Sequence, residues 1–165
     1  MSVEAIHRVG LGTDLHRLEP GGPLRLGGVD IPFEFHAAAH SDGDVVLHAI
    51  TDALLGAAGL PDIGERFPDT DPAYKGADSV KLLADVVADI RRRGWVPVNL
   101  DVVVHAQRPK LSAHKEAVRT HIAHLLGLST DRVAVKAKTG EGLDAVGRGE
   151  AVGCTAVVGL ASISC

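Results

Sequence analysis

Apolar and polar residues alternate along two long stretches of the chain, and this period of two is typical of β-strands. The stretches run from Arg8 to His16 and from Val96 to Ala106. In the second, Leu100, Val102 and Val104 are expected to share one face. Further strands are predicted over Val133–Lys138 and Ala151–Ile163, and Gly27-Gly28 between the apolar runs Leu24–Leu26 and Val29–Ile31 predicts a small β-hairpin.

Helical spacing of apolar residues separates these strands. Helices are predicted from Ser41 to about Gly56, from Asp78 or Ser79 to Arg93, and from Ser112 to Leu126. The first begins with the spacing of a capping box, since Ser41 precedes Asp44 by three residues. Its expected apolar side consists of Val46, Ile50, Ala53, Leu54 and Ala57. The other two are followed by Gly94 and Gly127, which suit helix C-termini.

The order of these elements predicts one domain over residues 1–165. Its class is α/β (α+β), with a mixed β-sheet, helices on one face and the small hairpin. A chain of 165 residues can bury roughly 70% of its unfolded surface. Only 3% of the residues are aromatic, whereas 45% are hydrophobic, so the core must consist of Val, Leu, Ile and Ala.

Composition excludes several classes of protein. A net charge of −4 argues against nucleic-acid binding. No apolar run approaches the ~20 residues of a membrane span, and the N-terminus lacks the apolar core of a signal peptide. The two cysteines are Cys154 and the terminal Cys165, which argues against a disulfide framework. We therefore expect a cytoplasmic protein with no membrane or nucleic-acid partner.

A carboxylate and two imidazoles form the most informative chemical pattern. Asp14 and His16 are two residues apart, so they point to the same side of a strand. His48 lies on a predicted helix, in one stripe with Asp44 and Asp52. Two histidines and one aspartate suit a catalytic zinc ion with an open fourth position. Asp44 or Asp52, one turn away, is expected to orient the imidazole of His48.

Each of these residues also has a structural explanation. Asp14 fits a turn, His16 an exposed strand position and His48 a hydrogen-bonded helix position, and nine histidines make chance pairs common. Asp44 fits a helix cap as well as it fits a partner of His48, and the two roles are compatible.

The segment from Gly59 to Gly76 is predicted to be a long loop with three prolines and four carboxylates. A loop of this length is often functional, although aspartates beside prolines also form ordinary turns. Carboxylates accept hydrogen bonds from hydroxyls, so a polyol would suit them. Cationic and donor side chains for phosphate lie later in the chain, at Lys110, Lys136, Lys138, Thr139 and Arg148. The turn Thr139–Gly142 resembles a phosphate-binding turn, but glycine-rich turns are weak indicators alone.

Long motifs resemble one enzyme family across nearly the whole chain. They are GTDLH, LGGVDIP, AHSDGDVVLHAITDALLGAAGLPDIGERFPDTDPAYKGADS, HAQRPKL, VAVKAKTGEG and VGRGEAV. Together they resemble 2-C-methyl-D-erythritol 2,4-cyclodiphosphate synthase of the non-mevalonate isoprenoid pathway. The resemblance implies a homotrimer with active sites between subunits. It also implies a cytidine diphosphate substrate that cyclises with release of CMP.

The resemblance also implies roles for single residues. Asp14, His16 and His48 match the ligands of one zinc ion per subunit, and Glu141 matches a ligand of a second ion, Mg²⁺ or Mn²⁺. His40 and Thr139 match stabilisers of the transition state. The remaining matches are Ser41, Asp62, Ile63, Gly64, Phe67, Pro68, Asp69, Thr70 and Asp71 for the methylerythritol phosphate, Ala106, Pro109, Lys110 and Ala137 for cytidine diphosphate, and Arg148 near the three-fold axis.

Two other functions are compatible with the same ligands. A zinc-dependent phosphoesterase would use metal-bound water as its nucleophile and release linear phosphates. A zinc-stabilised nucleotide-binding domain without catalysis is disfavoured, because structural zinc sites fill all four positions and favour cysteine, which is absent near Asp14 and His48.

Overall fold

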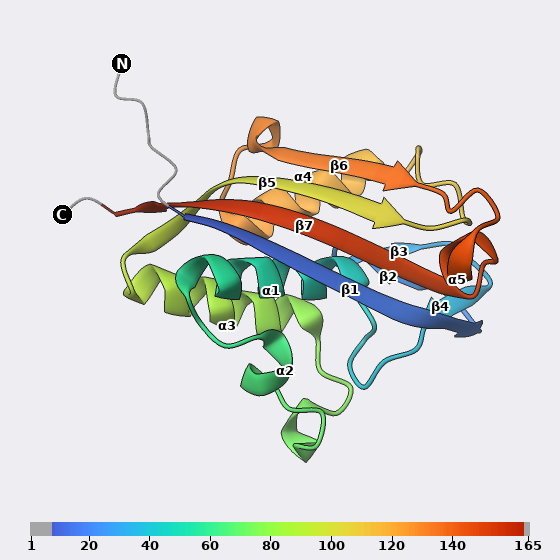
Figure 1. Cartoon of the computed structure of the whole chain (residues 1–165), viewed down its shortest axis with the longest axis horizontal. Helices are drawn as coiled ribbons and strands as arrows, with labels where there is room; N and C mark the ends of the chain where they lie inside the picture. Colours follow the sequence, from blue (N-terminus) through green and yellow to red (C-terminus); the bar gives the residue numbers. More distant parts are fainter. Residues whose placement is uncertain (1–7, 164–165) are drawn as a thin grey trace.

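A five-stranded mixed sheet, in the order β4-β1-β7-β5-β6, is the framework of the protein (Figure 1). The computed structural model describes residues 8–163. The strands are β1 (Arg8–Pro20), β4 (Phe35–Ala37), β5 (Trp95–His105), β6 (Val133–Lys138) and β7 (Ala151–Ser162). All neighbours are antiparallel except β5 and β6, which run parallel. The predicted hairpin forms a separate two-stranded sheet of β2 (Leu24–Leu26) and β3 (Val29–Ile31).

Three long helices cover one face of this sheet. They are α1 (Val45–Ala58), α3 (Ser79–Arg92) and α4 (Lys115–Leu126). The helix α1 packs on β1 and β7, α3 packs beside α1, and α4 packs on β6. The predicted apolar residues of α1 are all buried, as are Leu100, Val102 and Val104 of β5. The predicted α/β class, the helices on one face and the hairpin are confirmed.

Two glycines of β1 allow α1 to lie unusually close to the sheet. A Cβ atom on Gly10 would come within 1.9 Å of the carbonyl oxygen of Ala53, and one on Gly12 within 2.0 Å of that of Ala49. Any side chain there would push the helix away. Close approach therefore requires glycine at both positions.

The opposite face of the sheet is open in this chain. Residues that alternate with the two glycines point to that face, and Val9, Leu11 and Leu15 are 65%, 63% and 61% exposed. Val157 of the neighbouring β7 is 40% exposed. Exposed apolar side chains gathered on one sheet face are typical of surfaces that contact other molecules.

Several sequence-based boundaries were wrong in detail. The capping residue of α1 is Asp44, whose side chain accepts from the Leu47 N–H, and not Ser41. The helix α4 begins at Lys115 rather than Ser112. The segment 59–76 is not one loop, because it contains α2 (Ile63–Arg66) and a 3₁₀ turn at Pro72–Tyr74. A short helix, α5 (Asp144–Gly147), likewise interrupts the glycine-rich segment before β7, and β4 was not predicted.

The helices and the cysteines bear on two further predictions from the sequence. Within residues 8–163, no helix is long and apolar enough to span a membrane. Cys154 is a free thiol buried in β7, and burial raises its pKa. Cys165 lies outside the described residues.

Candidate metal centre and nucleotide pocket

One carboxylate oxygen and two ring nitrogens meet between β1 and α1. Asp14 Oδ2 lies 2.8 Å from His16 Nε2 and 2.9 Å from His48 Nδ1. The two nitrogens are 3.1 Å apart. All three residues are partly buried. The predicted triad is therefore assembled, with three donor atoms facing one point.

The close approach of α1 to β1 explains how these atoms meet. Successive turns of the helix place Ala53 over Gly10 and Ala49 over Gly12. Asp14 and His16 continue the same face of the strand, because side chains two residues apart point to the same side. His48 precedes Ala49 on this helix, so its side chain lies close enough to the strand to reach Asp14. The Leu15 N–H donates to the other oxygen, Asp14 Oδ1, at 2.9 Å and fixes the carboxylate.

The charge and chemistry of this group fit a divalent metal ion. Burial raises the pKa of Asp14, but hydrogen bonds and charge interactions with His16 and His48 outweigh that effect and hold it well below its usual value. The carboxylate is therefore available as an anionic ligand at neutral pH. Imidazole nitrogen and carboxylate oxygen are common zinc ligands, and three protein ligands leave one position open. Four protein ligands would be expected at a structural site.

The second ring nitrogen of His48 faces two hydroxyl groups. His48 Nε2 lies 3.0 Å from Ser41 Oγ and 2.8 Å from Ser79 Oγ. Ser79 Oγ in turn donates a hydrogen bond to Asp42 Oδ1. Sequence reasoning missed Ser79 and Asp42, because Ser79 is 31 residues from His48 and reaches it only through the packing of α3 on α1.

The prediction that Asp44 or Asp52 orients His48 is wrong. Asp44 is fully buried and accepts from the N–H groups of Gly27, Gly28 and Leu47 at 2.8, 2.6 and 3.0 Å. Its side chain joins the hairpin to the start of α1, and its carbonyl oxygen accepts from the His48 backbone N–H at 3.0 Å. The partners of the His48 ring within residues 8–163 are instead His16, Asp14, Ser41 and Ser79. Asp52 Oδ1 accepts from the Ile63 N–H at 3.1 Å and holds the start of α2.

The triad opens into a cavity of 390 Å³. The lining contains His40 and five of the nine residues predicted to bind the methylerythritol phosphate, which are Ser41, Ile63, Gly64, Phe67 and Asp69. Ala39, Tyr74 and Leu82 also line it and were not predicted. The ring of Tyr74 meets that of Phe67 edge to face at 5.3 Å, so the 3₁₀ turn closes one side of the cavity.

Not every predicted carboxylate faces this cavity. Asp62 caps α2 by accepting from the Glu65 N–H, and Asp71 caps the 3₁₀ turn by accepting from the Ala73 N–H. Asp62, Pro68, Thr70 and Asp71 lie outside the cavity lining. Asp69 is the carboxylate of this segment that lines the cavity, so the ordinary turn-forming explanation holds for Asp62 and Asp71.

A second, separate pocket of 170 Å³ lies at the ends of β5 and β6. Its lining contains the predicted nucleotide residues Ala106, Pro109, Lys110 and Ala137 together with Thr139. It shares no residue with the metal cavity, so His40 and Thr139 lie in different pockets of one chain. Glu141 is exposed and adjoins Thr139, whose Oγ accepts from the Glu141 N–H at 3.3 Å. Arg148 is paired with Glu150 at 3.0 Å beside a third pocket.

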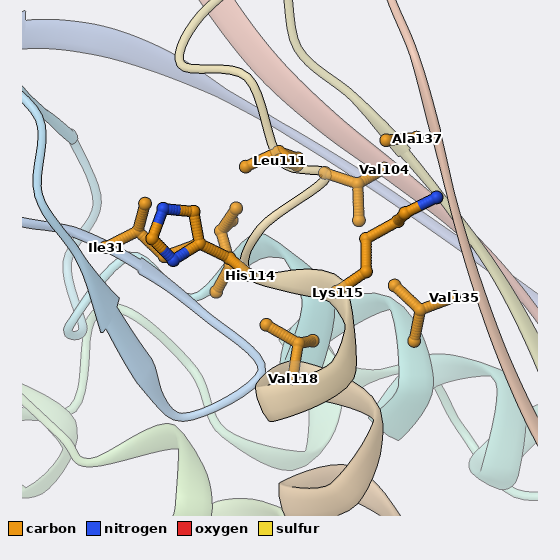
Figure 2. A pocket seen from close by; sticks show the side chains of 9 residues that line it. Ile31, Val104, Leu111, His114, Lys115, Val118, Val135 and Ala137 are labelled. Atoms are coloured by element: carbon orange, nitrogen blue, oxygen red, sulfur yellow. The ribbon is translucent and has the colours of Figure 1, made fainter.

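A narrow apolar pocket adjoins this nucleotide pocket (Figure 2). Leu111 and Ala137 belong to both linings. The other side chains drawn around it include Val104, Val118 and Val135 from β5, α4 and β6. His114 and Lys115 from the start of α4 also line it. In the adjoining nucleotide pocket the donors for a charged ligand are Lys110, Lys138 and Thr139.

An α/β domain with an open three-ligand centre in a cavity has the features of a metal-dependent enzyme. The chain belongs to the YgbB family, whose model matches residues 7–161. It is 55% identical to the 2-C-methyl-D-erythritol 2,4-cyclodiphosphate synthase of Bordetella petrii, over 95% of this chain and 97% of that protein.

Solved structures give the same relationship. A 2C-methyl-D-erythritol-2,4-cyclodiphosphate synthase in a CDP-bound form has a TM-score of 0.86 and 44% identity, covering 93% of this chain and 99% of that one. The bifunctional IspDF of Campylobacter jejuni has a TM-score of 0.90 and 44% identity over 94% of this chain. This chain spans 42% of that bifunctional protein.

Proposed function

We propose that this protein is a phosphorus–oxygen lyase of isoprenoid precursor biosynthesis, acting in the cytoplasm. It converts 4-diphosphocytidyl-2-C-methyl-D-erythritol 2-phosphate to 2-C-methyl-D-erythritol 2,4-cyclodiphosphate and CMP. The observation that carries the proposal is the open Asp14–His16–His48 triad at a cavity lined by the predicted substrate residues. Its relatives bear the name of this synthase over nearly their full length.

The reaction is an intramolecular transfer. An oxygen of the 2-phosphate attacks the β-phosphorus of the diphosphate, and the bond from that phosphorus to the CMP oxygen breaks. The attacking oxygen is already anionic at neutral pH, so no side chain has to remove a proton. The barrier is the approach of one anion to another in line, which positioned cations and donors lower.

Residues of the metal cavity are assigned to the methylerythritol half. Asp14, His16 and His48 would hold a zinc ion, which would supply positive charge to the diphosphate oxygens. The hydroxyl of Ser41 and the ring of His40 bind the phosphate. Asp69 accepts from the substrate hydroxyls, and the apolar wall of Ile63, Gly64 and Phe67 holds the carbon chain in its folded conformation.

Residues of the second pocket are assigned to cytidine diphosphate. Ala106, Pro109, Lys110 and Ala137 form its wall, and Thr139 donates to the transferred phosphoryl group. Glu141, on the exposed turn beside Thr139, is assigned as a ligand of a second ion, Mg²⁺ or Mn²⁺.

The protein is proposed to act as a homotrimer. Separation of the two pockets within one chain supports active sites in which each subunit supplies one half. The open face of the sheet, with Val9, Leu11 and Leu15 exposed, supplies the apolar surface for subunit contact. Sedimentation at micromolar concentration is expected to give a trimer, and a fully active monomer would contradict shared sites.

Incubation of the purified protein with the cytidylyl substrate tests the function. Phosphorus NMR is expected to show a cyclic diphosphate and CMP, and a chelator is expected to stop the reaction. Linear phosphates containing oxygen from solvent would instead establish a phosphoesterase. Binding of the nucleotide without turnover would establish the non-catalytic alternative.

A further inference from the structure

A row of hydrogen bonds leads from the candidate metal centre to two residues outside the cavity lining, Ser79 and Asp42. His48 Nε2 lies 2.8 Å from Ser79 Oγ, which donates to Asp42 Oδ1. Ser79 is the first residue of α3 and is 1% exposed. Its side chain therefore faces His48 and Asp42 inside the protein and cannot exchange these partners for water.

Asp42 determines which group donates in each hydrogen bond between Asp42, Ser79 and His48. Both of its oxygens face donors: Oδ1 accepts from the Asp44 N–H at 3.3 Å and from Ser79 Oγ, and Oδ2 accepts from the Ser79 N–H at 3.0 Å. Arg25 Nε lies 3.5 Å from Oδ2 and adds positive charge. A carboxylate in this environment only accepts, so the hydroxyl proton of Ser79 points to Asp42.

That direction leaves the lone pairs of Ser79 Oγ for His48. With a metal ion bound at Nδ1, the ring would carry its one proton on Nε2 and donate it to Ser79 Oγ, and the Nδ1 lone pair would face the ion held between Asp14 Oδ2 and His16 Nε2. This is the tautomer that a metal ligand needs at Nδ1. Ser41 Oγ also lies 3.0 Å from Nε2, but it accepts from the Gly43 N–H at 3.3 Å, and that contact leaves the direction of its own proton open.

We infer that Ser79 and Asp42 are positioning residues for the metal centre: Asp42 orients the Ser79 hydroxyl, and that hydroxyl fixes the tautomer and ring angle of His48. The inference rests on the metal site of the proposed function. It also separates the two serines that contact His48. Ser79 serves the metal from within the protein, whereas the hydroxyl of Ser41, in the cavity lining, remains available to substrate.

The test is the zinc dissociation constant of Ser79→Ala, measured by competition with a chromophoric chelator. Loss of such a partner typically weakens metal binding by about 10- to 100-fold, and we expect about 10-fold here. Thr51→Val is the matched control, because Thr51 is equally buried on α1 and its hydroxyl donates to the Leu47 carbonyl oxygen instead. It should bind zinc as the wild type does. Ser41→Ala should also retain zinc affinity while losing turnover.

A second measurement avoids variants altogether. In the zinc-loaded wild-type protein, the proton on His48 Nε2 should exchange slowly with water and show a nuclear Overhauser contact to the β-protons of Ser79. Contact with Ser41 alone, or exchange too fast to detect the proton, would overturn the inference. This measurement decides even where Ser79→Ala does not fold.

The outcomes separate this inference from the proposed function. A wild-type protein without specific zinc binding overturns both. Zinc binding by the wild type with equal affinity in Ser79→Ala overturns the positioning role alone. A lower thermal midpoint of metal-free Ser79→Ala with unchanged zinc affinity assigns Ser79 only to the packing of α3, and likewise overturns it. Asp42→Asn is expected to weaken zinc binding too, because its amide must place one donor against a donor.

Discussion

The metal cavity and the nucleotide pocket are built in different ways. The metal ligands come from β1 and α1, are partly buried, and are fixed by hydrogen bonds with Leu15, Ser41 and Ser79. The nucleotide pocket is lined largely by the exposed end of β6 and the segment after β5, and Lys138 and Thr139 are exposed. A single chain therefore fixes the positions of the metal ligands, whereas side chains of the nucleotide pocket remain exposed to solvent. This difference supports the proposal that a second subunit completes the nucleotide pocket.

Removal of a metal ligand should have the largest effect. His48→Ala is expected to lose bound zinc, measured by elemental analysis, and to lower turnover by about 100-fold or more. His124→Ala is the control, because His124 is an exposed histidine of α4 outside both pockets. Normal zinc content in His48→Ala would contradict the assignment of the triad.

Mixed oligomers should reveal whether the two pockets of one site belong to different chains. His48→Ala and Lys110→Ala are each expected to be poorly active alone. Co-expressed and purified as mixed trimers, they should regain about one third of wild-type sites, because in each mixed trimer one site takes its metal half from Lys110→Ala and its nucleotide half from His48→Ala and so contains neither mutation. No recovery in confirmed mixed trimers would place both halves of each site in a single chain.

Lys110→Ala should affect substrate binding more than the metal. We expect a rise in KM of about 10-fold or more with unchanged zinc content, because one charged hydrogen bond to the diphosphate is lost. Lys136→Ala is the matched control, since Lys136 is paired with Asp101 at 2.7 Å and lies outside the pocket lining. Equal KM values for the two variants would contradict the assigned role of Lys110.

Two neighbouring aspartates should show the smallest and most selective effects. Asp69→Ala, in the cavity lining, is expected to raise KM about tenfold with little change in stability. Asp71→Ala removes a cap and should lower the free energy of unfolding by about 1 kcal/mol with little change in KM. Thermal unfolding and steady-state kinetics on both variants check this pair. The reverse pattern would assign Asp71 to substrate and Asp69 to the loop.

Periodicity predicted the long strands and helices because each buries one regular face. Short elements such as β4 and α2 were missed, since they are fixed by contacts with distant residues rather than by their own pattern. The Leu18↔Ala37 pairing that defines β4, for example, joins it to the far end of β1. The aspartates of the acidic segment could not be told apart from the sequence for the same reason. Asp62 and Asp71 cap local turns, whereas Asp69 lines the cavity.

The sequence by itself determined the α/β class, the metal triad and the family resemblance, because these depend on spacing within elements and on long motifs. Tertiary structure alone decided which groups surround His48. Asp44 and Asp52 have the helical spacing to face it, but the carboxylate of Asp44 accepts from N–H groups of the hairpin turn and of α1, and that of Asp52 from the first N–H of α2. N–H groups at the start of a helix have no partner within the helix, so these carboxylates supply one. Ser79 reaches the ring from another helix. Such a contact depends on how closely α1 and α3 pack, and no local pattern encodes that distance.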